Sequence, residues 1–487
     1  MLAPPTPSDP PTEKRLALAL LAVSLGVGAA LRVGWALSED GLYWPDEVYQ
    51  SLEPAHRLVF GYGLQAWEFV EGARNWALPA LVAVCFKLAG WMGLAEPRGY
   101  LGLTRSVFGL VGAATAWGSW RLARAYGASA LAATAGASLF ALGAVPLYFA
   151  PRALSENASA LPVVLGLALA LAPGASRRAV FGGASLLGLA VLLRLQNGVF
   201  CGGLLVVLGA RREWSHVRDA LAVLAGWALL FGLLDWLTWG RWFHSARVYL
   251  DFNLVRGQAA AWGTAPFSYY GEVLARSMGA LSAVALALSL LAVRRAPGLF
   301  GVALAFWVLH ALQPHKELRF LLPVLPVLAS LAGVGLDTLL RHLPPSPVRL
   351  ALPLGMVALA GVSATRAGRL TFGELGQYET IKPRASAWDD SGPINRLLIA
   401  AGHRPDVCGL KMEAVHIAWS GGYSYFHRDV PLYAHNGPGR SSGVYNYIIT
   451  GVGHSGSGEV VASEGAHALV RLRPGCTPDP AFSSRLP

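Results

Sequence analysis

Two adjacent carboxylates, Asp46 and Glu47, follow the first long apolar stretch of this chain. At the edge of a membrane, ionisable groups are costly to desolvate and are functional-site candidates by default. A carboxylate there can accept a proton from a substrate hydroxyl, and an adjacent pair can hold a divalent metal ion. The loop that continues from them is unusually polar and aromatic; it contains Gln50, Glu53, His56, Trp67, Glu68, Arg74 and Trp76.

A second concentration of charge is the run His-Lys-Glu-Leu-Arg-Phe at 315–320. Its first five residues carry three cations and an anion, which single snorkelling side chains at a membrane surface do not explain. Arg binds phosphate as a planar fork and Lys as a point charge. The candidate phosphate ligands are therefore His315, Lys316 and Arg319, with Arg152 and Arg194 as secondary candidates. For either secondary candidate taken alone, snorkelling is the preferred interpretation.

The elements that must position these residues are membrane helices. Of the 487 residues, 54% are hydrophobic and 14% are charged, whereas a soluble domain carries about a quarter charged residues. The net charge of +11 lies mostly in short loops between apolar runs, as the positive-inside rule describes for cytoplasmic loops. We therefore expect an integral multi-pass membrane protein with no nucleic-acid partner.

Apolar stretches long enough to cross a bilayer, which takes about 20 residues, predict eleven spans. The segment 78–94 is short and contains Lys87 and Gly90, so we assign it to a juxtamembrane or re-entrant helix at the outer surface. With this choice the basic loops fall on the cytoplasmic side, and the polar groups above, together with Asp235, collect on the outer side. The predicted spans are 16–37, 103–120, 128–149, 157–173, 179–193, 197–210, 219–238, 276–293, 298–313, 320–340 and 349–365.

The composition changes after Thr365. Residues 1–365 form the predicted transmembrane domain, whose first outer loop is 38–77. Residues 366–487 contain no span and carry short strand-like runs separated by Gly, Pro and Ser, which predicts a small α/β exoplasmic domain. The strand-like runs are 407–419, 445–450 and 467–472.

Two features bear on the cellular location. Cys408 and Cys476 both lie in the C-terminal domain; they either pair, if that domain faces an oxidising compartment, or remain free thiols. Arg greatly outnumbers Lys, and Ala, Gly, Leu and Pro are abundant, which is associated with GC-rich bacterial genomes. We expect a bacterial plasma membrane, or the endoplasmic reticulum membrane if the source is eukaryotic, with the C-terminal domain outside.

The ordered motifs resemble those of glycosyltransferase family 22, the polyprenyl-phosphate-mannose-dependent α-mannosyltransferases of the GT-C superfamily. Residues 44–50, Trp-Pro-Asp-Glu-Val-Tyr-Gln, resemble the family's His-Pro-Asp-Glu-x-x-Gln signature, Trp67-Glu68 resembles its following Thr-Trp-Glu, and residues 315–320 resemble its His-Lys-Glu-x-Arg-Phe segment. The resemblance covers roughly residues 15–365. Trp44 departs from the family's His, which leaves the donor sugar and the acceptor open.

The resemblance implies a GT-C fold, an all-α membrane domain of about eleven spans plus a juxtamembrane helix, and an inverting transfer of mannose from a polyprenyl-phosphate donor to a glycan or lipid-linked glycan. Asp46 would be the general base for one in-line displacement, and Glu47 would support it or contact the sugar. We place a metal-independent reaction ahead of one with a divalent metal, because fixed cations can stabilise a phosphate leaving group. The remaining substrate-binding candidates are Gln50, Trp67, Glu68 and Asp235.

Two other functions compete with this interpretation. A GT-C enzyme could transfer a different sugar from a polyprenyl phosphate, and Trp44 keeps that alternative open. A lipid-linked sugar transporter or flippase would favour inverted repeats and charges near the bilayer midplane. Because no convincing internal repeat is found and the charges lie at the outer rim, the transporter ranks lower. A structural membrane protein without activity leaves the polar outer loops unexplained.

Overall fold

The computed structural model describes residues 9–344, 347–454, 456 and 458–486 and divides into two compact units. Unit 1 comprises Met1–Gly34 and Val107–Arg384, and unit 2 comprises Trp35–Ser106 and Ala385–Pro487. The first outer loop therefore belongs to the same unit as the C-terminal residues, although they lie far apart in sequence. The predicted division at residue 365 rests on composition and stays a prediction.

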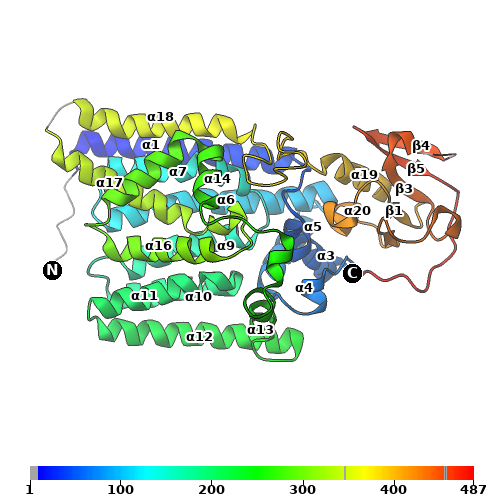
Figure 1. Ribbon diagram of the computed structural model, residues 1–487, viewed down its shortest axis with the longest axis horizontal. Coiled ribbons are helices and arrows are strands. Elements are labelled where there is room, and N and C mark those ends of the chain that lie inside the picture. Colours follow the sequence, from blue (N-terminus) through cyan, green and yellow to red (C-terminus); the bar gives the residue numbers. More distant parts are fainter. Residues whose placement is uncertain (1–8, 345–346, 455, 457, 487) are drawn as a thin grey trace. The chain divides into compact units, whose positions relative to one another are not determined.

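Unit 1 is a bundle of helices, in which α9 packs on α10, α10 on α12, and α17 on both α7 and α15 (Figure 1). The apolar runs of the sequence form these helices because a helix satisfies every backbone polar group inside its own segment, as lipid requires. The helices that lie wholly or mostly in unit 1 are α1 (Pro11–Ser38), α6 (Pro97–Ala125), α7 (Ala130–Ala141), α8 (Ala144–Phe149), α9 (Ser155–Ala170), α10 (Arg177–Leu193), α11 (Gly198–Ala210), α12 (Trp214–Trp239), α13 (His244–Leu250), α14 (Tyr269–Met278), α15 (Ala280–Leu291), α16 (Pro297–Leu312), α17 (Leu325–His342) and α18 (Pro347–Ala367).

Three of the described helices, α1, α12 and α18, are both long and apolar enough to cross a membrane. Six shorter apolar helices accompany them, among them α7, α9, α15 and α16. The chain is thus mostly helical and has the character of an integral membrane protein, while the count of eleven spans stays a prediction.

A helix break divides the predicted span 128–149, because α7 ends at Ala141 and α8 begins at Ala144. Arg32, a fully buried residue of α1, closes this break by donating hydrogen bonds to the carbonyls of Ala141 (2.6 Å) and Phe140 (3.1 Å). The last carbonyls of a helix have no partner within the helix. The buried guanidinium therefore satisfies groups that would otherwise be exposed to an apolar surrounding.

In unit 2, the first outer loop folds into short helices. The three-residue α2 (Pro45–Glu47) runs directly into a π-helical turn, η1 (Val48–Leu52), and then into α3 (Glu53–Phe60). Single π turns are rare and often occur at functional sites. The loop continues with α4 (Trp67–Val70) and α5 (Ala77–Trp91). The latter coincides closely with the segment 78–94 that was assigned to a juxtamembrane helix.

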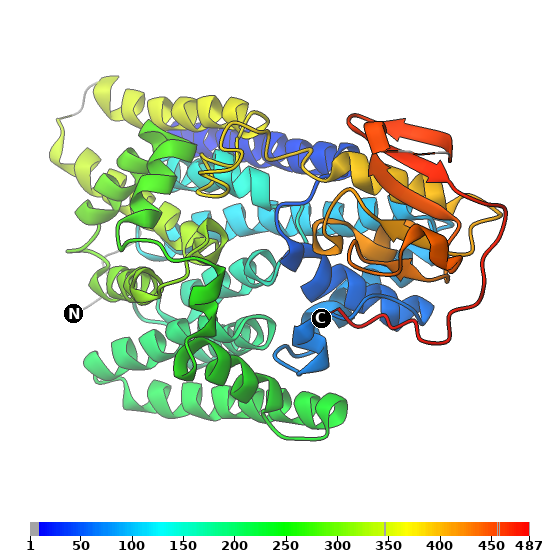
Figure 2. The same cartoon turned by 45° about the vertical axis from the view of Figure 1, so that its right-hand side comes forward.

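The C-terminal part of unit 2 is a five-stranded sheet of order β2-β1-β3-β5-β4, with α19 (Gly392–Gly402) packed against it (Figure 2). The strands β2, β1 and β3 are parallel to each other, while β3, β5 and β4 pair antiparallel, with Ile448 opposite Val470. The bounds are β1 Leu410–Met412, β2 Leu432–Tyr433, β3 Tyr447–Gly451, β4 Glu459–Glu464 and β5 His467–Arg471. The small sheet domain predicted from composition is present.

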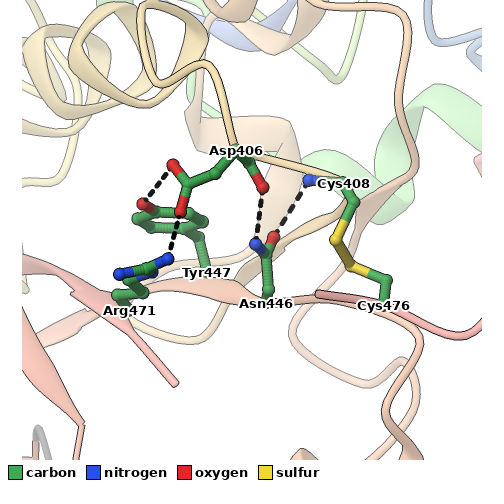
Figure 3. Close-up of a disulfide and its surroundings, with 6 residues drawn as sticks. All are labelled: Asp406, Cys408, Asn446, Tyr447, Arg471 and Cys476. Atoms are coloured by element: carbon green, nitrogen blue, oxygen red, sulfur yellow. Dashed lines mark hydrogen bonds and ion pairs between the residues drawn. A yellow bond between two sulfur atoms is a disulfide. The ribbon is translucent and has the colours of Figure 1, made fainter. Parts of the chain in front are cut away.

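Cys408 and Cys476 form a disulfide, with their Cα atoms 5.8 Å apart (Figure 3). Asn446 links the disulfide to the sheet, because it accepts a hydrogen bond from the Cys408 N–H (3.0 Å) and donates one to the Asp406 carbonyl (2.7 Å). Of the two alternatives for these cysteines, pairing is the one observed.

Candidate active site

The predicted site residues fall into two groups, one in each compact unit, and each group is described by itself. The carboxylate group of unit 2 contains Asp46, Glu47 and Glu68 with Gln50 and Trp67. The cationic group of unit 1 contains Arg194, His315, Lys316 and Arg319, together with the carboxylates of Glu156 and Glu317.

In the carboxylate group, Asp46 is half-buried and Glu47 is buried. Pro45 favours the start of α2, because its fixed φ suits the first helical turn, and this turn carries both carboxylates. The Tyr43 N–H donates to the Glu47 carboxylate at 3.3 Å. Glu47 therefore braces the turn, and Asp46 is the carboxylate with access to solvent.

Glu68 is the third member of this group. It is 7% exposed and accepts a hydrogen bond from the Gln50 amide nitrogen at 2.9 Å. Burial and the negative charge of Asp46 raise the pKa of Glu68 to about 7, while Arg74 and Gln50 act in the opposite direction. The charge of Asp46 contributes to this shift, so the two carboxylates lie close enough to interact electrostatically.

The cationic group of unit 1 is built on ion pairs between α9, the end of α10 and the loop before α17. Glu156, in the first turn of α9, lies 2.9 Å from Arg194 and 3.3 Å from Arg319. Arg319 also binds Glu317, through Nε at 2.8 Å and Nη2 at 2.9 Å. These four residues are all less than 5% exposed. A buried ion pair offsets the cost of desolvating its charges only when its geometry is good. Burial therefore restricts the positions of the guanidinium groups.

His315 and Lys316 have different surroundings. His315 hydrogen-bonds the Glu317 carboxylate through Nε2 at 3.2 Å and the Gly263 carbonyl through Nδ1 at 3.0 Å. The Lys316 ammonium donates to the Ala265 carbonyl at 2.6 Å and also to the carbonyl of Gln313. Lys316 thus ties the loop after η4 (Gln258–Trp262) to the loop after α16.

Two pKa shifts follow from this arrangement. Burial alone would raise the pKa of Glu317, but the charge of Arg319 and hydrogen bonds from His315 and Arg319 bring it down to about 2. Burial lowers the pKa of His315, but the hydrogen bond and charge of Glu317 more than offset this, so the pKa lies above its usual value. Glu317 is therefore ionised across the physiological range, and it orients both of its cationic neighbours.

The structure places the two remaining candidates, Arg152 and Asp235, differently. Arg152 is buried over the Tyr148 ring, 4.4 Å from its centroid, just before α9. Asp235, near the end of α12, accepts hydrogen bonds from the N–H and hydroxyl of Ser245 at 2.7 and 2.9 Å. Because Ser245 lies in the first turn of α13, Asp235 accepts from a backbone N–H that has no partner within the helix.

Sequence reasoning missed the role of Glu156, which holds two of the predicted cations. A strap formed by residues 368–384 follows α18 and belongs to unit 1. In this strap Gln377 donates to Glu317 at 3.5 Å. The strap also borders a cavity of about 570 Å³, lined by Arg276, Thr371, Gly373, Glu374, Glu379 and Pro383.

With this geometry established, comparison with known proteins assigns the family. Residues 27–382 match the model of the Alg9-like mannosyltransferase family. The chain belongs to the Alg9-like mannosyltransferase family. The matched region contains both groups of predicted site residues and ends within the strap after α18, so the sheet of unit 2 lies outside it.

Two curated members of this mannosyltransferase group illustrate the similarity. The chain is 32% identical over 323 residues to "GPI mannosyltransferase 3" of Yarrowia lipolytica, which covers 63% of the chain and 61% of the relative. It is 37% identical over 148 residues to "Dol-P-Man:Man(7)GlcNAc(2)-PP-Dol alpha-1,6-mannosyltransferase" of Drosophila melanogaster, covering 29% of the chain and 21% of the relative. The matched region thus spans at most about three fifths of the length of these curated relatives.

Among solved structures, ArnT from Cupriavidus metallidurans bound to undecaprenyl phosphate is similar over 96% of the chain and 99% of its own length. The TM-score is 0.61 and the sequence identity is 16%. This likeness shows a shared fold, the GT-C fold, for the Alg9-like chain.

Proposed function

We propose that this chain is a membrane-bound inverting mannosyltransferase that moves mannose from a polyprenyl-phosphate-mannose donor to a glycan or lipid-linked glycan acceptor. Membership of the Alg9-like mannosyltransferase family supports the reaction class. Mannose is supported by the names of the similar enzymes, one of which names Dol-P-Man. A lipid phosphate is supported by the fold neighbour that binds undecaprenyl phosphate.

The observation that carries the proposal is the charge of the buried cationic group. Arg194 and Arg319 both pair with Glu156, Arg319 also pairs with Glu317, and these four residues are all less than 5% exposed. Buried guanidinium groups that carboxylates already hold in place form a preorganised site for a further anion. The phosphate of a lipid-linked sugar is such an anion, and Arg side chains bind phosphate through bidentate hydrogen bonds.

Within this proposal the chemistry is a single in-line displacement at the sugar's anomeric carbon. The acceptor oxygen forms the new bond as the bond to the phosphate oxygen breaks, and the electron pair of that bond leaves with the lipid phosphate. Asp46 takes the proton of the acceptor hydroxyl, which raises the nucleophilicity of its oxygen as the sugar gains positive charge. Arg319 and Arg194 stabilise the charge on the departing phosphate. Glu47, Gln50, Trp67 and Glu68 shape the surroundings of the base.

We further propose that the reaction needs no divalent metal and takes place at the outer face of the membrane. The support for the first point is that fixed guanidinium groups provide positive charge for a leaving phosphate. The second is supported by the Cys408–Cys476 disulfide, because disulfides form and persist in oxidising compartments. A bacterial plasma membrane, or the endoplasmic reticulum membrane of a eukaryote, satisfies this condition.

A second candidate differs in the sugar alone. Trp44 stands where family 22 has His, and its ring packs edge-on against Trp419 with centroids 4.9 Å apart. An indole can donate one hydrogen bond but accepts none, so it cannot reproduce the acceptor role of an imidazole toward a sugar hydroxyl. The second candidate function is therefore transfer of another sugar from a polyprenyl-phosphate donor.

The test uses purified full-length protein in nanodiscs with a panel of radiolabelled polyprenyl-phosphate sugars and a lipid-linked glycan fraction as acceptor. Transfer from the mannose donor is the expected result. Transfer from another sugar donor alone would keep the reaction type and replace the substrate. If no donor is consumed, the transferase proposal is wrong and transport of the lipid-linked sugar becomes the leading function.

A further inference from the structure

The C-terminal sheet domain lies beyond the family-matched residues 27–382, yet the segment that carries Asp46 is bound to it at several points within unit 2. The Leu42 N–H donates to the Asp390 carbonyl at 2.9 Å. The Tyr49 hydroxyl donates to the Ile417 carbonyl at 2.7 Å. The short helices of the first outer loop are therefore held by the C-terminal residues before and after the carboxylates.

The strongest of these connections is made by Glu53, the first residue of α3, to α20 (Gly422–Phe426). One carboxylate oxygen of Glu53 accepts hydrogen bonds from the Ser424 N–H at 2.5 Å and from the Ser424 hydroxyl at 2.7 Å. The other accepts one from the Leu64 N–H at 2.7 Å. Glu53 is fully buried, so the loss of any of these bonds would leave a buried polar group without its partner.

The backbone of α20 is adapted to this contact. Gly422 has a positive φ of +55°, and a Cβ at this position would meet the carboxyl carbon of Glu53 at 2.7 Å. Only glycine allows the carboxylate to approach the chain so closely at low cost. The neighbouring residue pair His56 and His427 extends the same contact, with a hydrogen bond of 2.9 Å between their ring nitrogens.

We propose that Glu53 is a positioning residue: through Ser424 it lets the C-terminal domain hold the turn that presents Asp46. This inference rests on the proposed function, because it assigns Asp46 the role of the base. Glu53 itself lies six residues after Glu47, the last residue of α2. It is not one of the proposed reacting groups. It acts by fixing the start of α3. Because α2, η1 and α3 follow one another without a break, fixing α3 also fixes the turn of α2 that carries Asp46. The sheet domain is then part of the catalytic apparatus.

The surroundings of Glu53 make a substitution informative. Because N–H or O–H donors point at both of its oxygens, a Gln side chain must turn its NH₂ group toward one of them. The Glu53→Gln variant thus keeps the size of the side chain and breaks the anchoring. Ser424→Ala removes a single hydroxyl and retains the backbone donor, so it is a milder version of the same change. A matched control is Glu413→Gln, because Glu413 also lies in unit 2 and pairs with Arg440 at 2.6 Å.

The experiment compares these variants as full-length protein in nanodiscs by two measurements. The first is kcat and KM for the lipid-linked donor per folded molecule. We expect Glu53→Gln to lower kcat about tenfold or more, since a displacement of about 1 Å can cost a hundredfold, with donor KM unchanged. Ser424→Ala should lower kcat about fivefold, as befits one hydrogen bond. Glu413→Gln should leave both constants at the wild-type values.

The second measurement is amide hydrogen exchange, which does not depend on activity. We expect the peptides covering residues 42–64 to exchange faster in Glu53→Gln and Ser424→Ala, while β3 and β5 keep their protection. Unchanged kcat and unchanged exchange in both variants would overturn the proposal. A rise in donor KM without a fall in kcat would also overturn it, because Glu53 would then serve binding.

The two measurements separate this inference from the proposed function. If the wild-type protein consumes no donor, the transferase function is wrong, and the exchange data alone decide whether Glu53 anchors the first outer loop. If Glu53→Gln does not fold, Ser424→Ala decides the proposal with the same criteria.

Discussion

Arg194 and Glu156 form an ion pair of 2.9 Å in which the side chains are 2% and 1% exposed. Arg194 ends α10 and Glu156 begins α9, so the pair joins two adjacent helices at the same end of the helical hairpin. Arg319 approaches the same carboxylate oxygen at 3.3 Å. One carboxylate thus sets the positions of two guanidinium groups, which makes Glu156 the organising residue of the cationic group.

Glu156→Gln should therefore destabilise the protein and weaken donor use together. Removing one partner of a buried ion pair costs about 3–5 kcal/mol, because the remaining charge stays uncompensated. We expect a lower thermal unfolding temperature in detergent that is partly restored by saturating polyprenyl phosphate, since the ligand's phosphate supplies the missing negative charge. An unchanged unfolding temperature would contradict the role given to Glu156. Asp251→Asn, which removes an exposed pair with Arg256, is the control and should have little effect.

Arg319 and Lys316 should respond differently to substitution. Arg319→Lys keeps a positive charge but loses the fork that binds Glu317, so we expect a marked loss in kcat/KM for the donor. Lys316→Ala should also weaken donor use, through loss of charge and of the ties to the Ala265 and Gln313 carbonyls. Donor kinetics of both variants provide the measurement. Wild-type donor kinetics in either variant would remove that residue from the phosphate site.

Glu68 should make stability depend on pH. Its pKa is raised to about 7 in the folded protein, above about 4.3 in an unfolded chain. The folded state therefore binds more protons between these values, so the contribution of Glu68 to stability is largest at low pH and is lost as the pH rises through about 7. Glu68→Gln, which resembles the protonated form, should flatten this part of the profile. Unfolding temperatures from pH 5 to 8 test this.

The control for the pH experiment is provided by Glu53, whose pKa burial also raises to about 7. Its contribution has the same sign and remains in the Glu68→Gln variant, so the slope should become smaller without vanishing. A wild-type slope in that variant would show that Glu68 is not titrating in this range.

The disulfide should stabilise the sheet domain. Cys408 and Cys476 are 68 residues apart, and closing a loop of that size stabilises by about 4 kcal/mol in the chain-entropy model. Cys408→Ser with Cys476→Ser should lower the unfolding temperature of the protein, and reduction of the wild type should do the same. Thiol labelling after unfolding, with and without reductant, checks the pairing. Labelling of both thiols without reductant would contradict it.

Much of the fold was predictable because apolar periodicity and basic loops report directly on membrane helices. The segment 78–94 forms the helix α5, while its placement at the membrane surface, inferred from Lys87 and Gly90, stays a prediction. The strands β3 and β5 were predicted because they are buried and apolar in sequence. The edge strand β4 was missed because it is largely exposed, and β2 because it has only two residues. The break between α7 and α8 depends on Arg32, more than a hundred residues away.

The candidate site was predictable only as a set of residue types. Adjacent carboxylates and a His-Lys-Glu-x-Arg run are visible in the sequence, but their partners are distant in it. Glu156 meets Arg319 across more than 160 residues, and Glu53 meets Ser424 across 371. Such contacts depend on tertiary packing, so the local sequence pattern does not predict which residues pair. The roles of the individual site residues stay predictions until kinetics test them.

The central claim is that Asp46 is the base of a metal-independent mannosyl transfer. The most direct measurement is transfer of radiolabelled mannose from polyprenyl-phosphate-mannose into a lipid-linked glycan fraction by the wild type and by Asp46→Asn, each with and without EDTA. We predict transfer by the wild type that resists EDTA, and none by the variant, which should still fold and bind the donor. Turnover by Asp46→Asn would contradict the assignment of the base, and loss of wild-type transfer in EDTA would contradict the metal-independent mechanism.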